Sequence, residues 1–146
     1  MKIALGSDHG GFELKNLVKA HLEARGFTCA DCGSFDTERV DYPVYGEKAA
    51  RMVASGACEL GIVVCGTGCG IALAANRVKG IRCCNCSEPF TAQLSRRHNN
   101  CNMLALGGRV VGAELALMIV DNFIDATFEG GRHADRVNLI EAIDRN

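Results

Sequence analysis

An apolar run enters a glycine-rich turn in the segment Ile62-Val63-Val64-Cys65-Gly66-Thr67-Gly68-Cys69-Gly70-Ile71-Ala72. The run before Cys65 is typical of a buried strand. The glycines lack a Cβ atom, so consecutive backbone N–H groups can converge on a negatively charged oxygen. The helix-like residues that follow would add the positive end of a helix dipole. The segment therefore predicts a strand that delivers a thiol into an anion-binding turn, although a tight turn without a ligand gives the same pattern.

Strand-like and helix-like stretches alternate on both sides of this segment. Apolar runs predict strands at 2–6, 27–32, 61–65, 81–86 and 103–106. Helical periodicity and capping residues, Ser87 among them, predict helices near 12–25, 45–55, 70–77, 88–97, 111–124 and 135–143. This alternation predicts an α/β fold, a three-layer αβα sandwich with a five-stranded parallel Rossmann-like sheet. A length of 146 residues, 48% of them hydrophobic, is expected to form a single domain over 1–146.

The first predicted helix has one apolar stripe, which we expect to pack on the sheet. Its members are Leu14, Leu17, Val18 and Leu22. Lys15, Lys19 and Glu23 fall outside the stripe.

The charge balance argues against several classes of partner. Sixteen basic and 17 acidic side chains leave no net field that would attract nucleic acid or a membrane surface. No apolar run reaches the ~18 residues that a membrane-spanning helix needs. Gly6 interrupts the N-terminus too early for the core of a signal peptide. We therefore expect a cytoplasmic protein with no nucleic-acid and no membrane partner.

The chain contains nine cysteines. In a small secreted protein they would indicate a disulfide scaffold, but the apolar fraction and the missing signal peptide favour reduced thiols. Cys29-x-x-Cys32 and Cys83-Cys84-x-Cys86 consist of residues that zinc or redox sites use, yet both lie in strand-like runs where cysteine packs as a small hydrophobe. Because no second pair follows at zinc-finger spacing, we expect packing there and no metal.

Polar side chains follow three of the predicted strands. In a parallel α/β sheet, ligands bind outside the carboxyl ends of the strands. Asp8 and His9 follow the first strand, the glycine-rich turn follows the third, and Arg109 follows the fifth. Asp8 and His9 would hold a substrate hydroxyl or ring oxygen, or would simply cap the first helix.

Two further candidates lie later in the chain. Arg132 and Arg136 stand four residues apart near the start of the last helix, where like charges repel by roughly a few tenths of a kcal/mol unless an anion lies between them. Bidentate binding of a phosphate would remove this repulsion, whereas a solvated helix face would tolerate it. His98 precedes the last strand and should lie near the amino ends of the sheet. A catalytic His98 would therefore serve the cleft of a neighbouring subunit.

Six motifs follow one another along almost the whole chain. They are Gly6-Ser7-Asp8-His9-Gly10-Gly11-Phe12, Asp41-Tyr42-Pro43, Cys65-Gly66-Thr67-Gly68-Cys69-Gly70-Ile71, Ser87-Glu88-Pro89, Ser95-Arg96-Arg97-His98-Asn99 and Glu129-Gly130-Gly131-Arg132-His133. In this order and spacing the chain resembles the type B ribose-5-phosphate isomerases, a family that also contains the galactose-6-phosphate isomerase subunits. The resemblance implies an aldose–ketose isomerase of the non-oxidative pentose phosphate pathway. It also implies a cis-enediol(ate) intermediate and no need for a metal or cofactor.

The resemblance further implies a role for each matched residue. Cys65 would be the base that moves a proton between C2 and C1, Thr67 would assist it, and His98 would help to open the sugar ring. The backbone from Gly66 to Gly70 would stabilise the enediolate oxygen, and the three arginines would bind the phosphate. The substrate contacts implied in this way are Asp8, His9, Gly66, Thr67, Gly68, Cys69, Gly70, Asn99, Arg109, Arg132 and Arg136.

Members of this family are homodimers or tetramers of dimers with shared active sites, so the resemblance implies the same assembly here, with a phosphorylated sugar as substrate. Three activities remain open: isomerisation of ribose 5-phosphate, isomerisation of a six-carbon aldose 6-phosphate such as allose or galactose 6-phosphate, and a non-catalytic thiol- or nucleotide-binding module. The galactose enzymes divide their catalytic residues between two different subunits. Because His9, Cys65, His98 and Arg132 occur in one chain, the first activity is favoured.

The sequence departs from the family pattern at Cys69, where relatives more often have an aliphatic or acidic residue. A second thiol at this position competes with Cys65 as the base, or could pair with it on oxidation. Cys65 is the residue that matches the cysteine-using members, so we expect it to be the base.

Overall fold

The protein is described by a computed structural model of residues 1–143. Its sheet consists of β1 (Lys2–Ser7), β2 (Thr28–Asp31), β3 (Leu60–Cys65), β4 (Cys83–Asn85) and β5 (Met103–Gly107). The strand order is β2-β1-β3-β5-β4, and every neighbouring pair is parallel. The predicted five-stranded parallel sheet is confirmed, although β4 is shorter than the predicted 81–86.

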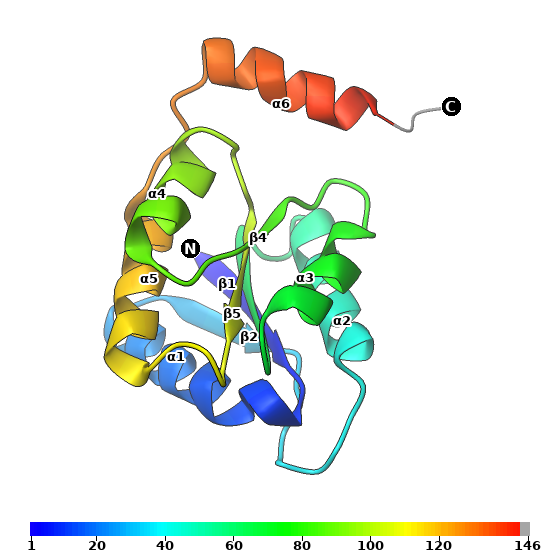
Figure 1. Ribbon diagram of the computed structural model, residues 1–146, viewed down its shortest axis with the longest axis vertical. Coiled ribbons are helices and arrows are strands. Elements are labelled where there is room, and N and C mark those ends of the chain that lie inside the picture. The colour runs from blue at the N-terminus through cyan, green and yellow to red at the C-terminus, as the bar shows by residue number, and fades with distance from the viewer. Residues whose placement is uncertain (144–146) are drawn as a thin grey trace.

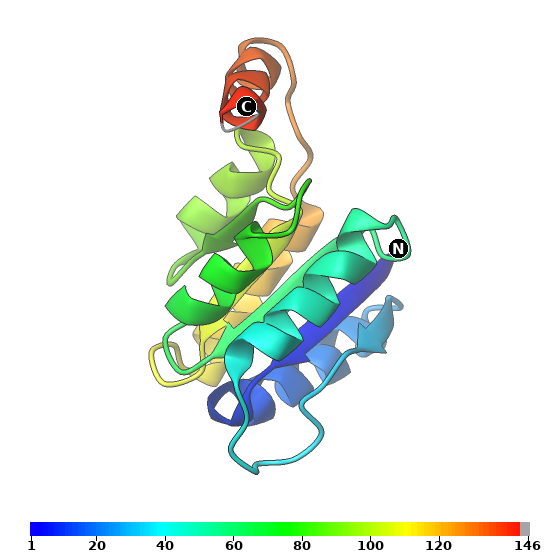
Figure 2. The ribbon, with the colours of Figure 1, turned by 90° about the vertical axis from the view of Figure 1, so that its right-hand side faces the viewer.

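Helices cover both faces of the sheet. The three helices α1 (Phe12–Ala24), α4 (Pro89–Arg97) and α5 (Ala113–Asp125) lie on one face, and α2 (Tyr42–Ala54) and α3 (Cys69–Asn76) lie on the other (Figure 1). Figure 2 shows the α2 and α3 layer in front of the strands. Each space between helices and sheet holds its own apolar cluster, so the central strands are buried on both faces. None of the described helices is both long enough and apolar enough to cross a membrane.

The helices α3 and α5 begin within two residues of the predicted 70 and 111, and the starts of α2, α4 and α6 (Arg132–Ala142) differ for identifiable local reasons. Because Pro43 lies in its first turn, where no N–H is needed, α2 begins at Tyr42. The helix α6 begins before residue 135 because Gly130 and Gly131, with φ of 69° and 56°, turn the chain directly into it. Glu88, not Ser87, caps α4 by accepting N–H groups from the first turn.

The sheet-facing side of α1 differs from the predicted stripe at two positions. Leu17 is 38% exposed, whereas Lys15 is only 1% exposed. The Lys15 ammonium donates to a carboxylate oxygen of Asp31 at 2.7 Å and to the carbonyl oxygen of Ser34 at 2.6 Å. A buried charge is stable only when it is paired in this way. Lys15 therefore ties α1 to the end of β2 and to the loop that follows.

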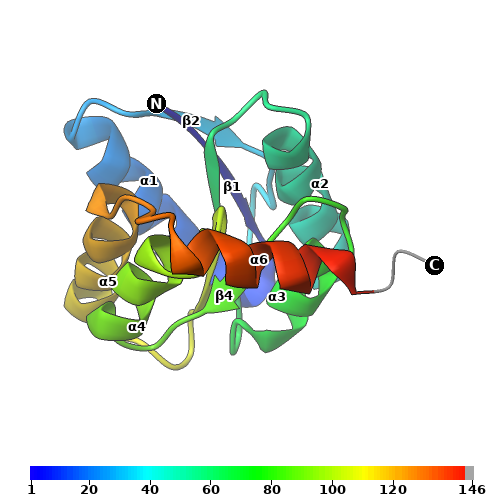
Figure 3. The same ribbon diagram turned by 90° about the horizontal axis from the view of Figure 1, so that it is seen from above.

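The last helix, α6, stands apart from both layers, beyond the amino ends of the strands (Figures 1 and 3). Its second half exposes Leu139, which is 70% exposed, and Ile143 directly after the helix is 71% exposed. The guanidinium of Arg82 holds the helix by donating to Glu141 at 2.7 Å. The position of α6 places Arg132 and Arg136 at the amino end of the sheet.

Candidate active site

The glycine-rich turn begins where β3 ends, at Cys65, whose side chain is 4% exposed. The N–H of Gly68 donates to the sulfur of Cys65 at 3.2 Å. Since α3 begins at the next residue, the positive end of its dipole faces the same region. Both the N–H donor and the helix terminus direct positive partial charge at the sulfur. The predicted arrangement of strand, thiol, turn and helix is confirmed.

Close backbone approach in this turn requires glycine at two positions. Gly68 has a φ of 83°, and the side chain of Asn85 lies where a Cβ atom would project. On the neighbouring strand β5, a Cβ atom on Gly107 would lie 2.7 Å from the carbonyl oxygen of Thr67. The turn therefore rests directly on the end of β5.

Two residues to which the sequence analysis assigned no role hold the turn. The side-chain amide of Asn85 donates to the carbonyl oxygen of Thr67 at 3.2 Å and to the sulfur of Cys69 at 3.3 Å. The ring of Tyr42 lies against the turn so closely that a Cβ atom on Gly70 would be 2.6 Å from it. Tyr42 belongs to a motif that we recognised, whereas Asn85 lies in an unremarkable strand-like run and gives no sequence signal.

Asp8 caps the short 3₁₀ turn η1 (His9–Gly11), and not α1 as one interpretation of the sequence predicts, since the N-cap of α1 is Gly11. The Asp8 side chain is buried, and an oxygen accepts the N–H of Gly11 at 3.1 Å. The neighbouring His9 accepts the N–H of Val40 on Nδ1 at 3.2 Å, so a neutral His9 carries its proton on Nε2. His9 Nε2 is therefore a candidate donor to a substrate oxygen, and the capped Asp8 keeps this segment in place.

Arg109 brings a positive charge to the same end of the sheet. Its N–H donates to the carbonyl oxygen of Gly66 at 2.9 Å. Its guanidinium lies so near the turn that a Cβ atom on Gly66 would be 3.3 Å away, and one on Gly10 would be 3.5 Å away. The structure therefore brings together the turn, the segment of Asp8 and His9, and Arg109, as predicted from the strand ends.

A second group of candidate residues surrounds His98 at the end of α4. The imidazole rings of His98 and His133 are stacked, with centroids 4.1 Å apart and an interplanar angle of 5°. One carboxylate oxygen of Glu129 lies 3.7 Å from Nε2 of His98 and 3.5 Å from Nε2 of His133. The other oxygen is bound by Arg97 at 2.5 Å. Since His133 follows Arg132 in α6, this cluster adjoins the two arginines predicted to bind phosphate.

Electrostatics distinguish the members of this cluster. The hydrogen bond from Arg97 holds the pKa of Glu129 below its usual value, with the nearby imidazoles acting in the same direction. Burial lowers the pKa of His133, and the positive charges of His98, Arg132 and Arg136 lower it further. Glu129 is therefore an anion at neutral pH, and His133 is more readily neutral than a free histidine.

The ligating atoms of His98, Glu129 and His133 all lie within 4.8 Å of one another. Parallel stacked rings direct their nitrogen lone pairs side by side and not toward one point, and Arg97 already binds one of the two carboxylate oxygens. The arrangement fits an ion-paired histidine cluster better than a metal centre.

The two groups lie at opposite ends of the sheet. Cys65 is at the carboxyl end of β3, and His98 precedes the amino end of β5, as expected (Figure 1). Asn99 follows His98, and its carbonyl oxygen accepts a hydrogen bond from Arg82 at 3.1 Å. One chain therefore does not bring Cys65 and His98 into a common site.

Comparison with known proteins identifies the family. A sequence model described as Ribose/Galactose Isomerase matches residues 3–140. The chain belongs to the ribose/galactose isomerase family. It is accordingly an aldose–ketose isomerase.

Similar proteins cover the whole length of this isomerase. Ribose-5-phosphate isomerase B of Escherichia coli is 54% identical over 144 residues, which are 99% of this chain and 97% of that protein. The structure of ribose-5-phosphate isomerase B from Clostridium thermocellum has a TM-score of 0.98 and 52% identity, and covers 99% of this chain and 98% of that one. Ribose-5-phosphate isomerase B from Mycoplasma genitalium, solved with bound ribulose-5-phosphate, has a TM-score of 0.94 and 37% identity, with 99% and 97% covered.

The cysteine pairs of the isomerase divide between the two apolar clusters. Cys29 packs in the cluster under α1, and Cys32 packs in the cluster on the opposite face of the sheet. Cys83 and Cys84 are separated in the same way. Burial raises the pKa of the Cys29 thiol to about 11 and raises that of Cys83 as well. These thiols pack as small hydrophobic groups, as the strand-like context predicts.

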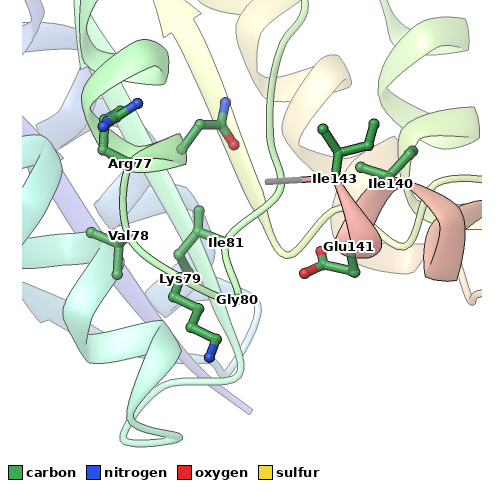
Figure 4. A pocket seen from close by; sticks show the side chains of 9 residues that line it. Arg77, Val78, Lys79, Gly80, Ile81, Ile140, Glu141 and Ile143 are labelled. Atoms are coloured by element: carbon green, nitrogen blue, oxygen red, sulfur yellow. The ribbon is translucent and has the colours of Figure 1, made fainter. Parts of the chain in front are cut away.

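A hollow of about 600 Å³ lies between the segment 76–81 and the end of α6 (Figure 4). Arg77, Lys79 and Ile81 lie on one side of it, and Ile140, Glu141 and Ile143 lie on the other. It contains none of the predicted site residues. The hollow is therefore a feature of the α6 attachment and not the substrate site of a single chain.

Proposed function

We propose that this isomerase interconverts D-ribose 5-phosphate and D-ribulose 5-phosphate through a cis-enediol(ate), with Cys65 as the base. The observation that carries the proposal is the hydrogen bond from the N–H of Gly68 to the Cys65 sulfur at the start of α3. The relatives named above support the choice of substrate.

In this reaction the Cys65 sulfur accepts one proton from carbon and gives one proton back to carbon. The Cys65 thiolate removes the proton from C2 of the open-chain aldose, and the electron pair forms the C1–C2 double bond while the carbonyl bond shifts onto O1. The resulting enediolate oxygen is negative. The protonated sulfur then gives a proton to C1, the proton on O2 passes to the negative O1, and the carbonyl forms at C2. General-base catalysis of this kind contributes about 10²–10⁴-fold to a rate.

The turn supplies the stabilisation of the negative oxygen. Asn85 and Tyr42 hold the turn from Gly66 to Gly70 in place. The N–H groups of Gly68 and Cys69 already donate to Cys65 and Thr67, so the other N–H groups of the turn are the donors for the enediolate oxygen. The Thr67 hydroxyl accepts the N–H of Cys69 at 3.3 Å, so its own proton remains available to a substrate oxygen. Arg109, beside the turn, is a cation available to the sugar phosphate. Asp8, His9 and Cys69 complete this half of the substrate site.

We also propose a homodimer, alone or within a tetramer of dimers, in which His98, Asn99, Arg132 and Arg136 of one chain complete the site of the other. Two observations support this. Cys65 and His98 lie at opposite ends of one sheet, and Leu139, Ile140 and Ile143, in and directly after the second half of α6, are exposed. Apolar side chains gathered on one helix are typical of a protein–protein interface.

We further propose that residues 1–146 act as one catalytic domain without a metal or cofactor, because Cys65 and the backbone donors provide both the base and the charge stabilisation. The nine free thiols fit a reducing compartment, and we propose the cytoplasm.

Turnover of ribose 5-phosphate by the chelator-treated protein tests the activity directly. We expect turnover in the wild type, a loss of at least about 100-fold in Cys65→Ala, and weak competition by allose 6-phosphate. Turnover of the six-carbon sugar phosphate alone would replace the proposed substrate. Absence of turnover with either sugar would point to a binding role.

Mixing of variants tests the shared site. Cys65→Ala and His98→Ala are each expected to be impaired. Random reassortment makes half of the dimers mixed, each with one intact site of two, so activity should return to about a quarter of the wild-type value. No recovery after verified subunit exchange would contradict the shared site.

A further inference from the structure

The carboxylate of Glu129 lies beside two stacked imidazoles, and neither the sequence motif nor the proposed reaction gives it a role. We propose that Glu129 is a positioning residue: it orients the His98 ring for opening of the sugar ring and keeps a proton on His98 in preference to His133. The inference rests on the proposed function, because ring opening is the role proposed for His98.

The position of Glu129 is fixed from two sides. Its backbone N–H donates to the carbonyl oxygen of Arg97 at 3.0 Å. The Nε of Arg97 donates to carboxylate oxygen Oε1 at 2.8 Å. Because Oε1 is occupied in this way, Oε2 is the oxygen that faces both imidazoles. Glu129 therefore links the end of α4, which carries His98, to the segment that leads into α6.

Stacking limits the two rings to one positive charge, so only one of them is an imidazolium at a time. Two imidazolium rings whose centroids are 4.1 Å apart would repel each other, and a single carboxylate lies between their Nε2 atoms. The charged groups facing the pair are Arg97 from α4, Glu129 from the connecting segment, and Arg132 and Arg136 from α6.

The surroundings of the two rings favour the positive charge on His98 over His133. His133 is nearly buried, with a side chain 9% exposed, and shares its helix with Arg132 and Arg136. The side chain of His98 is 35% exposed, so its charged form keeps more of its hydration. Glu129 stabilises the imidazolium of the pair, and the burial of His133 assigns that charge to His98.

A protonated, oriented His98 suits the ring-opening step. The imidazolium gives its proton to the ring oxygen, the bond between that oxygen and C1 breaks with its electron pair moving to the oxygen, and the C1 hydroxyl loses a proton to water as the carbonyl forms. General-acid catalysis needs the proton within hydrogen-bond reach of its acceptor. A ring that turns freely, or a proton transferred to His133, would weaken this step.

The test compares Glu129→Gln with Glu47→Gln in the full-length protein. The control removes the same charge from another arginine pair, since Arg51 Nε donates to Glu47 at 2.8 Å on α2. We expect Glu129→Gln to lower kcat for ribose 5-phosphate by about tenfold, to leave KM within about threefold, and to shift the alkaline limb of the kcat–pH profile to lower pH. Glu47→Gln should leave all three unchanged.

Nitrogen-15 NMR of the four imidazoles provides a readout that does not require activity. We expect the protonated fraction of His98 at pH 7 to fall in Glu129→Gln, with an unchanged melting temperature. In a His98→Ala background, Glu129→Gln should have no further effect on kcat. An unchanged protonated fraction, or additive losses in kcat, would overturn the positioning role. A wild type that does not turn over ribose 5-phosphate would refute the proposed function, while the protonated fraction would still decide the role of Glu129.

Discussion

The side-chain nitrogen of Asn85 lies 3.2 Å from the carbonyl oxygen of Thr67. This contact joins an edge strand to the turn after β3, although β5 lies between the two strands in the sheet. It holds in place the turn whose backbone donors we propose for the substrate.

Replacement of the Asn85 amide by a carboxylate of the same shape should therefore loosen the turn. In Asn85→Asp the donor becomes a negative acceptor beside a carbonyl oxygen and a thiol. We expect kcat to fall by about tenfold, less than the 10²–10³-fold caused by removal of a direct oxyanion donor. Steady-state kinetics measure the effect. Asn122→Asp is the matched control because Asn122 donates to Met118 on the distant helix α5, and equal kcat values for the two variants would contradict the role of Asn85.

The two thiols of the turn should differ in their contribution. Cys69 is exposed and lies within α3, whereas Cys65 is buried and accepts the N–H of Gly68. We expect Cys69→Val to retain activity within about threefold, and Cys65→Ser to lose at least about 100-fold because a hydroxyl is a much weaker base. The opposite order of effects would make Cys69 the base.

The buried ion pair of Lys15 and Asp31 should be important for stability. Lys15→Met leaves the carboxylate partly buried without its partner, which costs about 3–5 kcal/mol of unfolding free energy. Urea unfolding of Lys15→Met and Lys19→Met measures the difference. Lys19 pairs with Glu23 at 4.0 Å at the surface, so its loss should cost less than about 1 kcal/mol. Equal losses of unfolding free energy in the two variants would show that the burial of Lys15 does not increase its contribution to stability.

The histidine cluster should make stability depend on pH. The pKa of His133 is lowered in the folded protein, so the unfolded chain binds the proton first and stability falls as pH drops through 6.5. The pKa of Glu129 is also lowered, so its contribution, present above pH 4.5, is lost as pH falls further. Denaturant midpoints between pH 7.5 and 5 at fixed protein concentration should decline less in His133→Asn than in the wild type. Equal slopes would contradict this assignment.

Local patterns predicted most of the sheet and the positions of the candidate residues at its carboxyl end. The strand–thiol–turn–helix segment required only the order of apolar residues and glycines, and the position of Arg109 followed from the rule that ligands bind at strand ends. The burial of Lys15 could not be predicted because it depends on a carboxylate in β2. The role of Asn85 could not be predicted because its contact with Thr67 spans β5, which lies between β4 and β3.

The position of His98 shows what a single sequence can and cannot provide. Its place before the last strand correctly predicted the amino end of the sheet. Its stacking on His133 and the shared carboxylate could not be predicted, since they depend on the path of the chain between α5 and α6. The starts of α2 and α6 were missed for a similar reason, because proline and glycine conformations outweighed apolar periodicity there.

The central claim is that Cys65 carries a proton between C2 and C1. Its most direct test is conversion of ribose 5-phosphate in D₂O, with NMR detection of deuterium at C1 of ribulose 5-phosphate. The account predicts deuterium at C1 with the wild type, because the S–H of Cys65 exchanges with D₂O before C1 is reprotonated, and a rate of incorporation at least about 100-fold lower with Cys65→Ala. Incorporation at the wild-type rate in Cys65→Ala would contradict it.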